Sequence, residues 1–225
     1  MEGKCEFISA PLFPIPVGIY NFGENNHDLN VSLVEDILKE MSIDKSGEDH
    51  SNAGGWHSKP DLEKKYKSFS ELETILSECG NHYCETYGYK TGLVCSDLWA
   101  NVNKNGDFNF PHHHGTTALA GVYYPIESIV KDEWNYHYYA GNPLKGGTWN
   151  NNDGGTLVLQ DPSYGKKVQL LTDSKTPYNI DFYHLYPAPS LLILFPTYLL
   201  HMVTPFKDKD KMRLSVSFSF KYGQN

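Results

Sequence analysis

The run NFPHHHGTTALAGVYY, residues 109–124, leads from a histidine cluster into a short apolar and aromatic segment, Leu119–Tyr124, that is typical of a buried strand. If the backbone is also extended at the histidines, successive side chains alternate between faces, so His112 and His114 point to one side and His113 to the other. Neutral imidazole is a good ligand for iron, copper or zinc. The run therefore indicates either a metal site or, taken alone, a surface histidine cluster.

A third candidate ligand, His201, lies in a later predicted strand. Leu191–Phe195 is a fully apolar run, Pro196 turns the chain, and Leu199–Val203 begins another strand. A lone histidine in an apolar strand is usually a core residue. Together with the His-x-His pair, His201 completes a set of three imidazoles.

The last predicted strand, Met212–Tyr222, has two different faces, since apolar residues alternate with Arg213 and three serines. Arg213 is the sole arginine, and every other basic residue is a lysine. A guanidinium can bind a carboxylate through two parallel hydrogen bonds, which lysine cannot do. Arg213 and Ser215, on one face, predict a carboxylate-binding pair; a solvent-facing polar surface is the alternative.

Two amphipathic helices precede this β-rich half. Apolar residues recur at helical spacing over 31–41 and 72–83, and Ser-x-x-Glu capping boxes at Ser32 and Ser70 mark the expected helix starts. Residues 44–67 are rich in Gly, Ser, Asp and Lys and predict a loop. Short strands follow from about Cys95 at 98–102, 119–124, 156–159, 191–195, 199–203 and 212–222. This order predicts a mainly β sandwich or barrel with the N-terminal helices packed on one sheet.

The length of 225 residues predicts a single domain over residues 1–225. Residues 1–94 form a helical support region and residues 95–225 the β core, interrupted by an insertion at 126–155. The insertion is rich in tryptophan and tyrosine. It is either a lid over the substrate or a loop whose aromatic side chains pack locally.

The net charge of −8 carries no basic block, which argues against a nucleic-acid partner because phosphate binding needs clustered cations. The first residues lack the apolar core of a signal peptide, and no stretch has the apolar length of a membrane helix. We expect a cytoplasmic protein with no membrane partner. The oligomeric state is open.

These features together resemble the iron(II)- and 2-oxoglutarate-dependent oxygenase superfamily: a His-x-His pair at one strand, a distal histidine, and Arg-x-Ser on the next strand. More narrowly, five runs look like an oxygenase-like branch met in phage and marine bacterial genomes. They are GGWHS (54–58), NVNKNGDFNFPHHH (101–114), GVYY (121–124), GGTLVLQDP (154–162) and FPTYLLHMVTPF (195–206).

The resemblance implies a double-stranded β-helix, the jelly roll shared with cupins, that binds Fe(II) and uses 2-oxoglutarate as cosubstrate. The expected reaction hydroxylates a small molecule, a peptide or a protein side chain and decarboxylates 2-oxoglutarate to succinate. By position, His112, His114 and His201 would bind the metal, and Arg213 and Ser215 the distal carboxylate of 2-oxoglutarate. Asn101, Asn103 and Tyr124 would also touch the cosubstrate.

One residue departs from the superfamily pattern, which is usually His-x-Asp. Position 114 is a histidine, so the ligand set is neutral and the metal centre is one charge unit more positive. This change should weaken the retention of Fe(II) and alter oxygen activation.

Two other functions fit parts of the pattern. A cupin-type metal dioxygenase uses three histidines without 2-oxoglutarate, and Gly106 followed by His112-x-His114 matches the start of its motif, although the glutamate that should follow is absent. A non-catalytic jelly-roll protein of a phage, with a vestigial metal site, is the second alternative. Arg213 favours the 2-oxoglutarate-dependent oxygenase over both alternatives, because neither of them needs a buried carboxylate-binding group.

Overall fold

The structure is a computed structural model that describes residues 13–126, 129–130, 154–163 and 180–223. Within those ranges, no helix is both long enough and apolar enough to cross a membrane. The aromatic residues of the 126–155 insertion lie outside the described residues, so its two interpretations stay predictions.

Both expected helices are present, and each begins earlier than its capping box suggested. The helices are η1 (Gly23–Asn26), α1 (His27–Ile43), α2 (Leu62–Lys65) and α3 (Lys67–Thr86). The predicted caps are wrong: Ser32 lies inside α1, where its hydroxyl donates to the Asp28 carbonyl oxygen at 3.1 Å. Tertiary contacts stabilise the extra N-terminal turn, because the buried Asn30 donates to Ser190 Oγ (2.7 Å) and accepts from the Tyr123 hydroxyl (2.6 Å).

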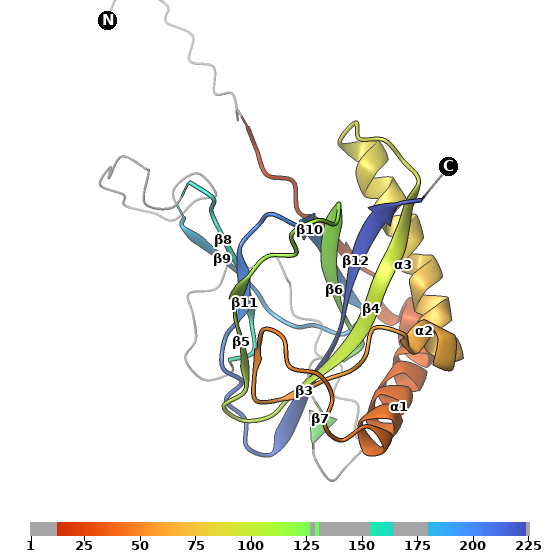
Figure 1. Cartoon of the computed structure of the whole chain (residues 1–225), viewed down its shortest axis with the longest axis vertical. Helices are drawn as coiled ribbons and strands as arrows, with labels where there is room; N and C mark the ends of the chain where they lie inside the picture. Colours follow the sequence, from red (N-terminus) through yellow and green to blue (C-terminus); the bar gives the residue numbers. More distant parts are fainter. Residues whose placement is uncertain (1–12, 127–128, 131–153, 164–179, 224–225) are drawn as a thin grey trace, which may run out of the picture.

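Two antiparallel sheets carry the rest of the described chain (Figure 1). The larger has the order β1 (Gly18–Asn21), β10 (Leu191–Pro196), β6 (Leu119–Tyr124), β12 (Lys211–Tyr222), β4 (Leu93–Asn103), β3 (Trp56–His57), with β7 (Ile129–Val130) pairing with β12. The smaller has the order β2 (Asn52–Ala53), β5 (Phe108–His112), β11 (His201–Val203), β8 (Leu157–Gln160), β9 (Phe182–Leu185). The predicted jelly roll with helices against one sheet is confirmed.

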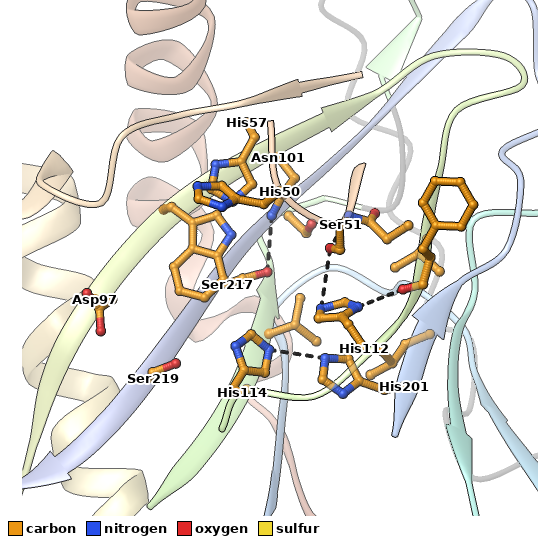
Figure 2. A pocket seen from close by; sticks show the side chains of 18 of the residues that line it. His50, Ser51, His57, Asp97, Asn101, His112, His114, His201, Ser217 and Ser219 are labelled. Carbon is orange, nitrogen blue, oxygen red and sulfur yellow. Dashed lines mark hydrogen bonds between the residues drawn. The ribbon is translucent and has the colours of Figure 1, made fainter. Parts of the chain in front are cut away.

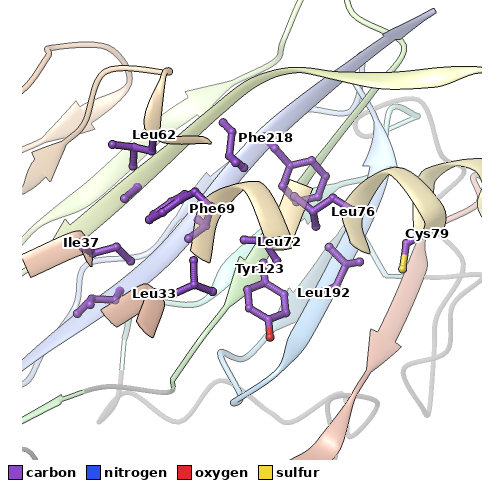
Figure 3. Close-up of a cluster of buried hydrophobic side chains, with 14 of the residues drawn as sticks. Leu33, Ile37, Leu62, Phe69, Leu72, Leu76, Cys79, Tyr123, Leu192 and Phe218 are labelled. Atoms are coloured by element: carbon purple, nitrogen blue, oxygen red, sulfur yellow. The ribbon is translucent and has the colours of Figure 1, made fainter. Parts of the chain in front are cut away.

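The apolar side chains form two layers. One lies between the helices and the larger sheet, where α1 and α3 bury Leu33, Ile37, Phe69 and Leu72 against the apolar face of β12, represented by Phe218 (Figure 3). The other lies between the two sheets and is built from β6, β8 and β10. The two predicted faces of the last strand are thus both buried, one under helices and the other facing the smaller sheet.

The close approach of β6, β10 and β12 explains why residue 121 is a glycine. A Cβ added at Gly121 in β6 would lie 2.5 Å from the Ile193 carbonyl oxygen of β10 and also against the Phe218 ring of β12. No side chain fits at this position of the sheet.

The segment 44–67 is more ordered than the loop that its composition predicted. It contains β2, β3 and α2, with the turn between the two strands made by Gly54 and Gly55 at φ +70° and +69°. The strands pair with β5 and β4 respectively, so this segment connects the two sheets. The backbone hydrogen bonds to the sheets override the polar composition of the segment.

Candidate functional site

A cavity of about 680 Å³ lies between the two sheets. The polar face of β12 and the Asp97–Asn101 part of β4 form one wall, while β5, β11 and the start of β8 form the opposite wall. Glu48, His50 and Ser51, from the segment before β2, line it as well; Figure 2 shows His50 and Ser51. All three predicted metal ligands and the predicted anion-binding arginine line this one cavity.

The three histidines converge, as the sequence predicted. His112 ends β5, His114 follows two residues later, and His201 begins β11 directly opposite His112 in the strand register. One ring nitrogen of each lies within 4.8 Å of the others, and His114 Nε2 is 3.1 Å from His201 Nε2. His113 is exposed and outside the group, so the alternation of faces predicted for this run is present.

Backbone carbonyl groups orient two of these rings. His112 Nδ1 is 2.7 Å from the Phe110 carbonyl oxygen, and His201 Nδ1 is 2.8 Å from that of Leu199. A carbonyl oxygen only accepts, so Nδ1 carries the proton in both rings and Nε2 keeps its lone pair. The lone pairs accept hydrogen bonds, from the Ser51 hydroxyl at His112 (3.4 Å) and from His114 at His201.

Burial keeps the three imidazoles uncharged. Desolvation, together with repulsion from the neighbouring histidines, lowers the pKa of His201 to about 3 and that of His114 to about 4. Burial also lowers the pKa of His112. Neutral imidazole is the form that binds metals, so the site is in its ligand form at neutral pH.

The donor set fits a first-row transition metal. Ligand nitrogens about 2.1 Å from one ion lie roughly 3.0–3.4 Å apart, a range that includes the separation of His114 Nε2 and His201 Nε2. Two rings already offer Nε2, and His114 would move its proton to Nδ1 when it binds. No carboxylate of the described residues belongs to this group.

Arg213 is the second unusual feature of the cavity, because it is 2% exposed and no described carboxylate pairs with it. Its Nε donates to the Gly155 carbonyl oxygen (2.7 Å), Nη1 to Asn103 Oδ1 (2.9 Å) and Ser215 Oγ (3.1 Å), and Nη2 to the Tyr124 hydroxyl (3.0 Å). These partners satisfy hydrogen bonds but supply no negative charge. A buried cation is costly without a counter-ion, so the arrangement suits an anionic ligand.

The other residues predicted to contact a cosubstrate also lie here. Asn103, Ser215 and Tyr124 all contact Arg213. Asn101 lines the cavity and donates to Ser217 Oγ at 3.1 Å. Burial raises the pKa of Tyr124, which therefore keeps its hydroxyl proton.

Several residues of the cavity were missed by the sequence reasoning. Asp97 and Trp99 share a face of β4 with Asn101, and the period-two alternation of that strand could have identified them. Ser51 precedes β2 and reaches His112 because β2 pairs with β5; of this segment, the sequence signalled only the turn at Gly54 and Gly55. Asp97 and Glu48 also line the cavity, although neither joins the three histidines.

Comparison with protein families gives one match. The family described as "Putative 2OG-Fe(II) oxygenase" matches residues 97–219, which include all three histidines and Arg213. The comparison with curated proteins returned no match.

Solved structures share the fold at low sequence identity. A prolyl-4-hydroxylase from Pseudomonas putida aligns with a TM-score of 0.57 and 14% identity, covering 93% of this chain and 94% of that one. The epimerase SnoN from nogalamycin biosynthesis aligns with a TM-score of 0.62 and 12% identity, covering 92% of this chain and 77% of that one. The viral collagen prolyl hydroxylase of Paramecium bursaria Chlorella virus-1 aligns with a TM-score of 0.53 and 12% identity, covering 91% of this chain and 96% of that one. At these identities the likeness establishes the fold alone.

Proposed function

The chain belongs to the 2OG-Fe(II) oxygenase family, and on that premise we propose that it is an Fe(II)- and 2-oxoglutarate-dependent dioxygenase. It would hydroxylate a small molecule, a peptide or a protein side chain while 2-oxoglutarate is decarboxylated to succinate. The observation that carries the proposal is the buried Arg213, a cation without a described anionic partner, in the cavity that also holds three neutral imidazoles.

In this proposal His112, His114 and His201 hold the metal through their Nε2 atoms. The carbonyl groups of Phe110 and Leu199 orient two of the rings before the metal binds, which lowers the entropic cost of binding. Three neutral ligands leave the charge of Fe(II) uncompensated by the protein. The negative charge at the metal would then come from the anionic cosubstrate alone, whereas in the His-x-Asp pattern an aspartate contributes as well.

Arg213 would bind the distal carboxylate together with Tyr124 and Ser215. A guanidinium has five N–H groups, and the four bonds described above leave one Nη2–H uncommitted among the described residues. The Tyr124 and Ser215 hydroxyls accept from Arg213, so each keeps its own hydrogen for donation. The carboxylate would thus accept three hydrogen bonds, one from a guanidinium N–H and two from hydroxyl groups. This differs from the two parallel hydrogen bonds expected from arginine alone.

Bound Fe(II) and 2-oxoglutarate would supply the oxidising chemistry, by reductive activation of oxygen coupled to loss of carbon dioxide. The protein positions the two groups and limits water. The apolar layer between the sheets, which includes Leu157 and Phe195, forms part of the cavity wall and lowers the local polarity.

The proposal is tested with chelator-treated protein under anaerobic conditions. Addition of Fe(II) and then 2-oxoglutarate should produce a visible metal-to-ligand charge-transfer band, and exposure to air should release succinate. If no band appears and no succinate forms, the proposed function is wrong.

A cupin-type dioxygenase is the second candidate, and His114 favours it because three histidines are its ligand set. It predicts iron binding and oxygen consumption that do not depend on 2-oxoglutarate. A non-catalytic protein would show neither succinate nor substrate oxidation. Arg213 favours the first candidate, since neither alternative uses a buried guanidinium.

A further inference from the structure

A second group of metal-binding side chains lines the same cavity and takes no part in the proposed function. Glu48, His50 and His57 each offer one ligand atom, and these atoms lie within 4.8 Å of one another. The group shares no residue with the three-histidine site. In Figure 2, His50 and His57 lie together beside Asn101, on the opposite side of Ser51 from His114 and His201.

The backbone brings these residues together. His57 belongs to β3 and pairs with Asn101 of β4, while Glu48 N donates to the His57 carbonyl oxygen at 2.9 Å. Gly47, at φ +60°, lets the chain pack closely here, because a Cβ would lie 2.5 Å from that same carbonyl oxygen. The arrangement is therefore held by main-chain contacts as well as by side chains.

The rings are also oriented. His57 is 7% exposed, its ring stacks on Trp99 (centroids 5.6 Å apart, planes at 18°), and Nδ1 is 2.7 Å from the Ser58 carbonyl oxygen. That contact places the proton on Nδ1 and leaves Nε2 with a lone pair. The His50 ring lies 4.7 Å from the His57 ring, and His50 Nε2 is 3.0 Å from Glu48 Oε2.

We propose that Glu48, His50 and His57 form a second metal site that binds a divalent transition ion of the zinc type. Two imidazole nitrogens and one carboxylate oxygen, with solvent in the fourth position, are a common zinc ligand set. The carboxylate also neutralises part of the ion's charge, which the three-histidine site cannot do. Ser51 follows His50 and contacts His112, so the ion would hold the 48–51 segment against the sheet beside the first site.

The competing interpretation needs no metal. His50 Nε2 and Glu48 Oε2 form a 3.0 Å surface hydrogen bond, and even as an ion pair such a contact contributes little by itself. His57 would then be a buried histidine satisfied by Ser58 and by stacking on Trp99. Counting bound ions separates the two.

The experiment measures zinc bound per chain by full-length, chelator-treated protein after equilibration with Zn(II) and gel filtration. Wild type is compared with Glu48→Gln/His50→Asn, which changes only residues with solvent-exposed or half-buried side chains. Glu24→Gln/His27→Asn is the matched control, because it removes the same two residue types at exposed positions near the start of α1. His112→Asn/His114→Asn removes two ligands of the first site.

We expect Glu48→Gln/His50→Asn to lose one equivalent of zinc that the control and His112→Asn/His114→Asn both retain. Co(II) bound to the His112→Asn/His114→Asn variant should give a ligand-field spectrum. The spectrum should be absent from the variant that combines these two substitutions with Glu48→Gln and His50→Asn. Equal zinc binding by wild type and Glu48→Gln/His50→Asn would overturn the proposal. So would loss of the same equivalent in the control. Circular dichroism checks that each variant is folded.

Discussion

Arg213→Lys is the most informative single substitution, because it keeps the positive charge and removes the planar group. The guanidinium donates four hydrogen bonds from three nitrogens to acceptors on different strands and loops. An ammonium has three N–H groups on one nitrogen and cannot reach all of these acceptors. At least one buried acceptor then loses its partner, so we expect the free energy of unfolding to fall by roughly 2 kcal/mol.

The same substitution should also weaken the binding of 2-oxoglutarate. The substitution removes the remaining Nη2–H and disturbs the hydroxyl groups of Tyr124 and Ser215, which Arg213 orients. Loss of one hydrogen bond to a charged group costs about 2 kcal/mol, which corresponds to a Kd roughly 30-fold higher. The Coulomb attraction of the retained charge should prevent a complete loss of binding.

The assay titrates 2-oxoglutarate into anaerobic, Fe(II)-loaded protein and follows the charge-transfer band, while urea unfolding gives the stability. Leu214→Ala is the matched control: Leu214 is the fully buried neighbour on the opposite face of β12, so its loss should cost stability by about 2–5 kcal/mol without changing the Kd. If Arg213→Lys binds 2-oxoglutarate as tightly as wild type, Arg213 does not hold the cosubstrate and the assignment is refuted.

Tyr124→Phe keeps the ring beside Arg213 but removes a hydroxyl donor, so the Kd for 2-oxoglutarate should rise about 10-fold in the same titration, with Fe(II) binding unchanged. Gly155→Ala should weaken 2-oxoglutarate binding and lower the unfolding free energy, because Gly155 has φ +65° and its Cβ would lie 2.8 Å from Arg213 Cδ; wild-type values for both would disprove the contact. Metal-free protein should lose stability as the pH falls from 6.5 towards 4, because the pKa of His201 is about 3 when folded and the unfolded state takes up a proton that the folded state does not. At pH 5 the proton uptake by the unfolded state should lower the free energy of unfolding by roughly 2 kcal/mol for His201. His201→Asn should make the free energy of unfolding, measured with urea, depend less on pH. If its pH dependence is the same as in wild type, burial of His201 is not the cause.

Period-two alternation accounts for much of what the sequence predicted correctly. Alternation separated His112 and His114 from His113, and it placed Arg213 and Ser215 on the face of β12 opposite the apolar side chains. Both results depend only on the direction of neighbouring side chains along one strand, which local sequence encodes. The predicted helix starts were wrong for the complementary reason. The Ser32 capping box was locally plausible, but contacts of Asn30 with Tyr123 of β6 and with Ser190, just before β10, stabilise an earlier start of α1.

The sequence by itself determined which residues have the chemistry: three histidines suited to a metal, and one arginine suited to a carboxylate. Only the tertiary structure decided that these groups share a cavity, because the distance between His112 and His201 depends on the pairing of β5 with β11. The Glu48, His50 and His57 group is the extreme case. Its residues come from a polar segment without periodicity, and they meet only because the folded backbone, through the pairing of β3 with β4 and the Glu48–His57 main-chain hydrogen bond, brings them together.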